Sequence, residues 1–295
     1  MEKVIISGAT GYIGLHLCKA LDSKYEVYAI VRKQSNLKEL KKYVSSKRII
    51  MLEDNIKKFY TQMKEIEPDY FVHLAGKFIS EHSEANLSDL LDSNLTAPVK
   101  MLDAICKAGC KNIINTGSYW QNYDGDNYNP VDLYAATKMA FSNMLKYYTE
   151  VMGCKSITLK LFDTYGKDDE RKKVLNIIRD MRDGETLDMT SCEQKVFYCY
   201  IDDVISAYMH ALKLIKTSKS QEHKEYSIRS EIPIPLKDIV LQLKNLSGKN
   251  IQLNFGKRDN RNREIMNPEG IGEVLPGWQE KYSIETGLKN FLNIK

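Results

Sequence analysis

Short apolar runs alternate with amphipathic stretches along the first half of the chain. A short run rich in β-branched residues is typical of a buried strand, whereas apolar positions three or four residues apart are typical of one face of a helix. Regular alternation of the two predicts βαβ units and therefore a parallel sheet. The predicted strands are residues 3–7, 26–31, 48–52, 70–74, 112–115 and 156–162, and the predicted helices are residues 14–22, 86–108 and 134–148.

Beyond about residue 165 the alternation becomes less regular. The pattern there predicts helices at 174–182, 204–215 and 236–246, a short apolar stretch at 196–201 and a short strand at 251–255. No internal repeat and no low-complexity tract interrupts it. We therefore expect an α/β chain with a large, regular first part and a smaller second part that interleaves with it.

Composition excludes several classes of protein. Of the 295 residues, 43% are hydrophobic and 28% are charged, which is the balance of a globular chain rather than a disordered one. The 43 basic and 39 acidic residues leave a net charge of +4, too small to indicate a nucleic-acid partner. No apolar run approaches the ~18 residues of a membrane helix, and the first residues do not resemble a secretory leader. We expect a cytoplasmic protein without a membrane partner, and the six cysteines, which lack zinc-ligand spacing, predict no metal site.

The strongest local motif is a glycine-rich turn between the first strand and the first helix, Gly8-Ala-Thr-Gly11-Tyr-Ile-Gly14. In this context Gly8 permits a tight turn, Gly11 lets a pyrophosphate approach the backbone, and Gly14 lets the helix pack closely on the strand. The helix N-terminus adds free N–H groups and a partial positive charge. The alternative is a turn that binds nothing. The motif predicts these dinucleotide contacts: Gly8, Thr10, Gly11, Tyr12, Ile13 and Gly14.

The end of the second strand indicates which dinucleotide binds. An acidic residue there would bind the ribose hydroxyls of NAD, but the sequence instead has Arg32, Lys33 and Ser35. Cationic side chains can hold a 2′-phosphate, so we expect NADP(H), with NAD(H) possible. A solvated basic turn is the alternative. Asp54 and Asn55, after the third strand, are candidates for contact with the adenine.

Tyr134 and Lys138 lie four residues apart on a predicted helix, so both side chains point to one face. A phenol with a pKa of about 10 is a poor acid or base near neutrality, and a neighbouring ammonium group stabilises its ionised form. The pair therefore predicts acid–base chemistry at Tyr134, with Lys138 also able to reach the nicotinamide ribose. A tyrosine and a lysine on a solvated helix face are the alternative.

Together these motifs resemble the extended short-chain dehydrogenase/reductase family of nucleotide-sugar epimerases, dehydratases and reductases. The resemblance covers nearly the whole chain and includes the segments His73–Gly76, Leu161–Gly166 and Tyr200–Val204. It implies a Rossmann-like doubly wound parallel sheet in residues 1–165, which also receives about 196–227. A smaller C-terminal α/β substrate-binding domain would comprise residues 166–195 and 228–295.

The resemblance also implies roles for single residues. Thr116 aligns with the catalytic Ser/Thr and would hold the reacting sugar oxygen near Tyr134, while Leu74, Ala75 and Gly76 would line the cofactor. The reaction implied is hydride transfer by the nicotinamide with proton transfer by Tyr134. Family dehydratases place an Asp-Glu pair after the catalytic Thr, whereas this chain has Gly117-Ser118, so we reject dehydration.

What remains is the reduction of a keto-sugar or C4 epimerisation. The basic second-strand end favours an NADPH-dependent reductase of the 4-keto group of a nucleotide-linked 4-keto-6-deoxy or 3,6-dideoxy hexose, as in bacterial surface-polysaccharide biosynthesis. The stretch Phe255–Met266 also resembles the bacterial reductases that make CDP-abequose. The alternatives are a C4 epimerase with tightly bound NAD and a non-catalytic NAD(P)-binding regulatory protein. Many members of the resembled family pair two long helices across a dimer interface, so the resemblance also implies a homodimer through residues 86–108 and 134–148.

The nucleotide-diphosphate sugar would meet a further set of side chains. Many family members carry an Arg that contacts the nucleotide diphosphate at the position of Val196, and a glycine at the position of Arg229. Arg261 is the first candidate for the diphosphate contact and Arg263 the second, with solvated loop charges as the alternative. The predicted substrate contacts are Lys77, His82, Ser118, Tyr119, Asp163, Arg261 and Arg263.

Overall fold

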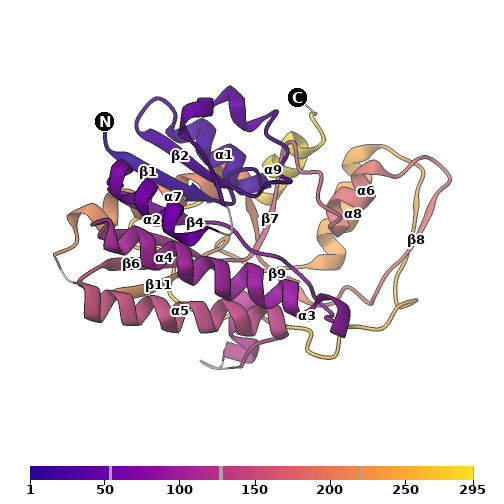
Figure 1. The fold of residues 1–295 in the computed structure, drawn as a ribbon. Coiled ribbons are helices and arrows are strands. Elements are labelled where there is room, and N and C mark those ends of the chain that lie inside the picture. The colour runs from indigo at the N-terminus through magenta and orange to yellow at the C-terminus, as the bar shows by residue number, and fades with distance from the viewer. Residues whose placement is uncertain (53–54, 126–128, 220, 295) are drawn as a thin grey trace.

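A seven-stranded sheet forms the centre of the fold in the computed structural model, which describes residues 1–52, 55–125, 129–219 and 221–294 (Figure 1). Its strand order is β11-β6-β5-β4-β1-β2-β3, and every neighbouring pair is parallel. The strands are β1 (Lys3–Ser7), β2 (Glu26–Val31), β3 (Ile49–Met51), β4 (Tyr70–His73), β5 (Asn112–Ser118), β6 (Lys155–Leu161) and β11 (His223–Ile228). The strand order reverses between β1 and β4, where a doubly wound sheet leaves a crevice. The expected fold class is confirmed.

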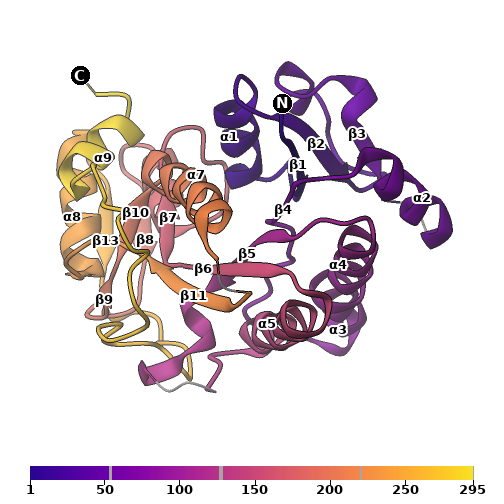
Figure 2. The same cartoon turned by 90° about the vertical axis from the view of Figure 1, so that its left-hand side faces the viewer.

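Helices cover both faces of this sheet (Figure 2). On one face lie α2 (Ile56–Ile66), α4 (Ala97–Lys107) and α5 (Leu133–Met152), whose apolar side chains share one buried cluster with the sheet. On the other lie α1 (Tyr12–Leu21) and α7 (Ile201–Thr217). None of the helices in the described residues is apolar over a length that could cross a bilayer.

The long helix expected at residues 86–108 is interrupted. The chain forms α3 (Glu84–Leu91), a π-helical turn (Asp92–Thr96) and then α4. Pro98 lies in the first turn of α4 and has no N–H to donate to the carbonyl of Asn94, four residues earlier. The wider turn points the side chain of Asn94 inward, where it is buried.

Apart from α7 and β11, which belong to the central layers, the described part of the less regular second half folds into three two-stranded sheets and three helices. The sheets pair β7 (Asp163–Tyr165) with β10 (Tyr198–Tyr200), β9 (Lys195–Val196) with β12 (Ile234–Pro235), and β8 (Thr186–Asp188) with β13 (Gln252–Asn254). The helices are α6 (Val174–Asp180), α8 (Leu236–Ser247) and α9 (Ile284–Phe291). One apolar cluster runs from β1 and α1 through α7 into α6, α8 and α9, so the two halves share a core. The division into two domains stays a prediction.

Candidate active site

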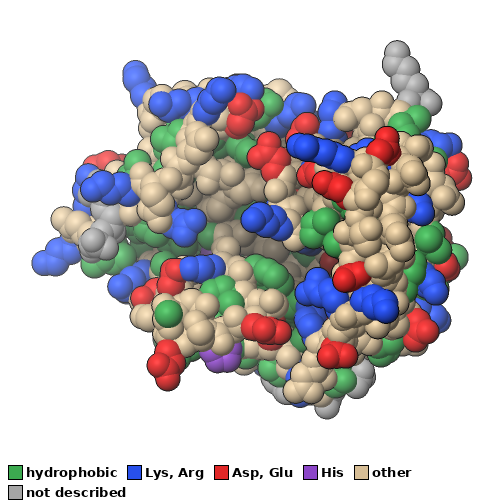
Figure 3. Space-filling model, turned by 90° about the vertical axis from the view of Figure 1, so that its right-hand side faces the viewer, with side chains coloured by type: hydrophobic (Ala, Val, Ile, Leu, Met, Phe, Trp, Pro, Cys, Tyr) green, Lys and Arg blue, Asp and Glu red, His purple; other side chains and the backbone are tan. Residues whose placement is uncertain are grey.

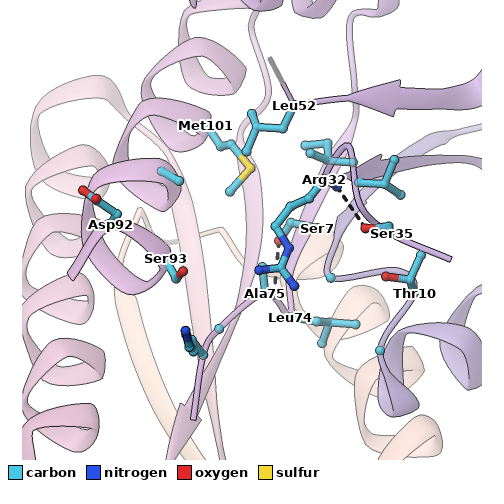
Figure 4. A pocket seen from close by; sticks show the side chains of 17 residues that line it. Ser7, Thr10, Arg32, Ser35, Leu52, Leu74, Ala75, Asp92, Ser93 and Met101 are labelled. Carbon is cyan, nitrogen blue, oxygen red and sulfur yellow. Dashed lines mark hydrogen bonds between the residues drawn. The ribbon is translucent and has the colours of Figure 1, made fainter. Parts of the chain in front are cut away.

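A pocket of about 680 Å³ opens at the crevice where the strand order reverses (Figure 4). Its walls come from the glycine-rich turn, the ends of β2 and β4, and the π-helical turn with the start of α4. On the face that lies toward α6 and α8 in Figure 1 the surface is hollowed near its middle, with Lys and Arg side chains around the hollow (Figure 3). The predicted site residues that line the pocket are Gly8, Thr10, Gly11, Arg32, Ser35, Leu74, Ala75, Gly76 and Lys77.

The glycine-rich turn is held too tightly for side chains. Gly8 has a φ of +73°, and a Cβ on it would lie 2.7 Å from the backbone nitrogen of Ala75, so the turn and the end of β4 approach backbone to backbone. A Cβ on Gly14 would collide with the carbonyl oxygen of Gly8 and the backbone of Ala9. Gly14 therefore allows α1 to pack closely on the turn that follows β1. Apolar side chains of α1 also pack against β1. Gly11 is the N-cap of α1 and offers no side-chain cap, which leaves the helix N-terminus open to a pyrophosphate.

Other predicted cofactor residues do not line this pocket. Tyr12 turns away, because its hydroxyl donates to the carbonyl of Lys167 (3.1 Å) and the guanidinium of Arg171 lies 4.3 Å from its ring centroid. Ile13 and Gly14 lie in α1, and Lys33 is exposed outside the pocket wall. Asn55 caps α2 by accepting from the N–H of Lys58, so it is used within its own helix. Asp54 lies outside the described residues.

Arg32 gives the pocket a cationic wall at the end of β2. Its side chain points into the pocket toward Ser7 and Ala75 (Figure 4). Its backbone N–H donates to the hydroxyl of Ser35 (3.1 Å), which fixes the turn that presents both residues. Among the described lining residues the only carboxylate is Asp92, on the π-helical turn rather than at the end of β2.

Tyr134, Lys138 and Thr116 meet beside this pocket. Lys138 on α5 is buried, its Nζ donates to the carbonyl oxygen of Thr116 on β5 (3.2 Å), and it lies 6.0 Å from the ring centroid of Tyr134. A Cβ on Gly76 would lie 3.0 Å from the same Nζ, so the ammonium group sits directly behind the pocket wall. Burial lowers the pKa of Lys138 to about 8, and burial followed by the charge of Asp132 raises the pKa of Tyr134. At neutral pH Tyr134 therefore keeps its proton.

Two hydroxyl groups on the same face of β5 are candidates for the sugar oxygen. The hydroxyl of Thr116, expected from the sequence, lies 2.6 Å from that of Tyr208 on α7, and both residues are buried. Ser118, two residues nearer the carboxyl end, is partly exposed, and its Oγ accepts from the N–H of Trp120 (3.3 Å). Ser118 is therefore the nearer of the two to the mouth of the site, and Thr116 lies deeper.

Side chains pack closely against the position after Thr116. A Cβ on Gly117 would lie 2.6 Å from Oε1 of Gln121 and 2.9 Å from Cγ2 of Thr158. A carboxylate there would require both neighbours to move.

Asn94 is a residue that the sequence reasoning missed. Its Nδ2 donates to the carbonyl of Lys77 and the hydroxyl of Thr137 (both 3.0 Å), while its Oδ1 accepts from the N–H of Lys77 (2.7 Å). It therefore ties the segment after β4 to α5 and holds Gly76 beside Lys138. The sequence did contain a signal, because a Pro inside a helix cannot donate a hydrogen bond to the residue four positions earlier, which is Asn94.

The predicted substrate residues are dispersed around the site. Lys77 pairs through its Nζ with Asp89 on α3, and His82 is exposed. Tyr119 donates to Asp163 on β7 (3.0 Å), and burial, then the charge of Asp163, raises the pKa of that phenol. These two residues therefore satisfy each other instead of both facing a ligand.

Both predicted diphosphate arginines stack on aromatic rings. The guanidinium of Arg261 lies 4.3 Å from the ring centroid of Trp120, and Glu264 accepts from it in a bidentate pair (2.9 and 2.8 Å). The guanidinium of Arg263 lies 4.4 Å from the ring centroid of Tyr123 and donates to Asn129. The charge of Arg261 is thus already matched by a carboxylate.

An exposed aromatic side chain lies against Tyr134. Phe78 is 60% exposed, its ring centroid lies 5.1 Å from that of Tyr134, and the two rings meet edge to face. The ring centroid of Trp120 lies 5.4 Å from that of Phe78. The entrance to the candidate site is therefore apolar on this side.

Known proteins resemble this chain along its whole length. CDP-abequose synthase of Salmonella muenchen is 28% identical to this chain, and the match covers 100% of this chain and 98% of that protein. CDP-abequose synthase of Yersinia pseudotuberculosis is 27% identical, and the match covers 90% of this chain and 92% of that protein. The solved structure of a UDP-glucuronic acid 4-epimerase from Bacillus cereus in complex with UDP-glucuronic acid and NAD has a TM-score of 0.80 at 18% identity, covering 99% of this chain and 98% of that one. The family model described as NAD dependent epimerase/dehydratase family matches residues 4–228. The chain therefore belongs to the NAD dependent epimerase/dehydratase family.

Proposed function

We propose that the protein is an NADPH-dependent reductase of the 4-keto group of a nucleotide-linked 4-keto-6-deoxy or 3,6-dideoxy hexose. The observation that carries this proposal is one juxtaposition. Arg32 at the end of β2 and Gly76 line the same pocket, and the ammonium group of Lys138 lies behind Gly76, 6.0 Å from the ring centroid of Tyr134. The full-length similarity to proteins named CDP-abequose synthase supports a nucleotide-sugar substrate.

The pocket fits a dinucleotide. Gly8 allows close approach of two backbone segments, the uncapped N-terminus of α1 can accept a pyrophosphate, and Arg32 can pair with a 2′-phosphate. The nicotinamide would supply the hydride that reaches C4 of the sugar.

The protein side chains would handle the proton and the developing charge. Tyr134 keeps its proton at neutral pH and would donate it to the sugar oxygen as the carbonyl is reduced. The hydroxyl of Thr116 or Ser118 would donate a hydrogen bond to the same oxygen and orient it. The ammonium group of Lys138 would stabilise the phenolate left on Tyr134, and it would also hold the nicotinamide ribose.

The apolar entrance favours a deoxysugar. Phe78 leaves most of its ring uncovered beside Tyr134, and Trp120 extends the apolar surface. A methyl or methylene group of a 6-deoxy or 3,6-dideoxy sugar would cover these rings without leaving a hydroxyl unpaired. His82 and Lys77 remain candidates for polar contacts with the sugar or its phosphates.

A C4 epimerase with tightly bound NAD is the second candidate, because an epimerase would use the same tyrosine and lysine. The two are distinguished by incubating the protein with NADPH and CDP-, dTDP- and UDP-linked 4-keto-6-deoxy sugars, including a 3-deoxy member, while nicotinamide absorbance is followed. We expect stoichiometric loss of NADPH with at least one of these sugars. Turnover of an unreduced nucleotide sugar without net loss of cofactor would instead establish the epimerase. A cofactor-binding regulatory protein would show neither reaction.

Replacing Arg32 with aspartate should invert the cofactor preference. Loss of a charged hydrogen bond to the 2′-phosphate costs roughly 10- to 100-fold in kcat/KM for NADPH, and the new carboxylate can bind the ribose hydroxyls of NADH. Lys33→Asp is the matched control, because Lys33 is exposed and does not line the pocket, and it should change the NADPH-to-NADH ratio much less. Equal effects of the two substitutions would contradict the role of Arg32.

We also propose that the protein forms a homodimer through α3 and α5. Three apolar side chains form one exposed stripe on α5, and two more lie on α3: Met144, Tyr147, Val151, Leu87 and Leu91. An uncovered apolar stripe at helical spacing is typical of an interface.

A Tyr147→Glu/Val151→Glu double variant should therefore be monomeric. By light scattering, the unmodified protein should have twice the 34.0 kDa mass of one chain, and the double variant should have the mass of one chain. Lys213→Glu, at an exposed position of α7, should leave the dimer intact. A monomeric unmodified protein would refute this interface.

A further inference from the structure

Arg229 is a half-buried cation that no described carboxylate neutralises. It follows β11 directly, and its Nη1 makes one long hydrogen bond, to the carbonyl of Ser230 (3.3 Å). Its Nε is buried and has no hydrogen-bond partner among the described residues. Since an unmatched guanidinium loses solvation on burial without recovering it from a partner, the arrangement calls for an anion from outside the chain.

The sheet register places Arg229 at the edge where the catalytic groups lie. Ser118 of β5 pairs with Leu161 of β6, and Leu161 pairs with Ile228 of β11, so the three residues form one row across the carboxyl ends of the strands. Arg229 comes one residue beyond this row. Two strand spacings of about 4.8 Å put its backbone roughly 10 Å from that of Ser118, a span that a hexose ring and the adjoining phosphate can bridge.

Aromatic rings connect Arg229 to the candidate active site. Its guanidinium lies 4.5 Å from the ring centroid of Phe197, which meets Phe162 edge to face at 5.3 Å. Phe162 stacks in parallel on Tyr119 at 4.5 Å, and Tyr119 adjoins Trp120. This row of rings runs from Trp120, beside Phe78, to Phe197, and Arg229 caps its far end.

A comparison with the neighbouring arginine sharpens the assignment. Arg261 also stacks on this row, but it gives its fork of donors to Glu264. Arg229 stacks on the ring of Phe197, but no described carboxylate accepts a hydrogen bond from it. Its outer nitrogens can therefore turn toward a ligand without breaking an ion pair. Glu269 acts on it only at longer range.

We propose that Arg229 binds the diphosphate group of the nucleotide-sugar substrate, an inference that rests on the function proposed above. Arg229 lies one residue beyond the row that contains Ser118, and its guanidinium rests on Phe197, so a diphosphate attached to a sugar at the end of β5 would come within its reach. Stacking on Phe197 holds the guanidinium plane, and the planar fork matches two phosphate oxygens. Arg261 then serves mainly to brace Trp120.

Calorimetric titration of the cofactor-loaded protein with CDP, UDP and dTDP tests this assignment. We expect the unmodified protein to bind at least one of the three, and Arg229→Met to bind it roughly 10- to 100-fold more weakly, as loss of a charged hydrogen bond predicts. Binding of the corresponding nucleoside, which lacks phosphate, should be unchanged. With the keto-sugar, KM should rise while kcat and the KM for NADPH change little.

Arg179→Met is a matched control, because Arg179 also stacks on a phenylalanine. Its guanidinium lies 4.8 Å from the ring centroid of Phe291, and the residue belongs to α6. This variant should bind the nucleoside diphosphate as the unmodified protein does. If Arg229→Met does not fold, Arg229→Lys can be used instead, because it keeps the positive charge but lacks the planar set of guanidinium donors. We expect Arg229→Lys to bind the nucleoside diphosphate several-fold more weakly than the unmodified protein does. Unchanged affinity in a folded Arg229 variant would overturn the assignment alone. Failure of the unmodified protein to bind any of the three diphosphates would overturn the proposed substrate class itself.

Discussion

Replacing Tyr134 with phenylalanine should lower kcat by roughly 10²- to 10⁴-fold, the range that general acid catalysis typically contributes. The substitution removes the hydroxyl that would protonate the sugar oxygen. It leaves the ring, whose edge-to-face contact with Phe78 at 5.1 Å is retained. Binding of NADPH, followed by nicotinamide fluorescence, should not change, because Tyr134 does not line the dinucleotide pocket.

Tyr148→Phe is the matched control for this substitution. Tyr148 lies on the same helix, and its hydroxyl donates to Asp103 (2.9 Å), outside the candidate active site. It should cost some stability and leave kcat near that of the unmodified protein. A Tyr134→Phe variant that kept most of its kcat would remove Tyr134 from the chemistry and favour a regulatory role for the chain.

Replacing Lys138 with methionine should abolish turnover and stabilise the cofactor-free protein. Methionine fills a similar volume, so packing against α5 and β5 is kept while the buried charge is removed. The ordinary pKa of 10.5 falls to about 8 on burial, which corresponds to roughly 3 kcal/mol of destabilisation at pH 7. Urea unfolding of both proteins at pH 7 should therefore show a higher free energy of unfolding for Lys138→Met.

The difference in free energy of unfolding between Lys138→Met and the unmodified protein should decrease as pH rises. Below pH 8 the lysine is protonated in the folded and unfolded states alike, so the full cost of burial is present. Between pH 8 and 10.5 the unfolded chain binds a proton that the folded chain does not, and the unmodified protein gains stability as pH rises. The advantage of Lys138→Met should therefore shrink over this interval.

Lys146→Met, at an exposed position of the same helix, is the control for this pair of measurements. Its ammonium group lies 3.8 Å from Glu150 at the surface, and it should change neither kcat nor the pH dependence appreciably. A Lys138→Met advantage that did not decrease between pH 8 and 9.5 would contradict a buried, charged lysine at this position.

Local pattern was sufficient for most of the central sheet. The strands predicted at residues 3–7 and 26–31 have the observed bounds, since a buried parallel strand is a continuous apolar run. The helix α2 was missed although Phe59 and Met63 mark its buried face. The edge strand β11 was missed for a different reason. Its sequence carries charged residues, and it is a strand because it pairs with β6, about seventy residues earlier.

Some features of the candidate site are local in the sequence and could be predicted, whereas others depend on contacts that only the fold creates. The glycine-rich turn, Arg32 and the four-residue spacing of Tyr134 and Lys138 are local features, and the sequence alone indicated them. The contact of Thr116 with Tyr208 joins residues that are 92 positions apart, and no pattern announces it. The pairing of Arg261 with Glu264 could be predicted from the sequence, because the two residues are only three positions apart. This pairing argues against Arg261, the first candidate for the diphosphate contact. Arg229 became a candidate only when the fold brought it over Phe197.

The most direct test of the proposed reduction follows the transferred hydrogen itself. NADPH carrying deuterium at both C4 positions of the nicotinamide is mixed with the protein and the keto-sugar that consumes it, and the product is examined by NMR and mass spectrometry. A reductase predicts one deuterium at C4 of the sugar and one NADP⁺ formed for each product molecule. A product that lacked deuterium at C4, formed without net oxidation of the added NADPH, would contradict the account and establish an epimerase that recycles its own cofactor.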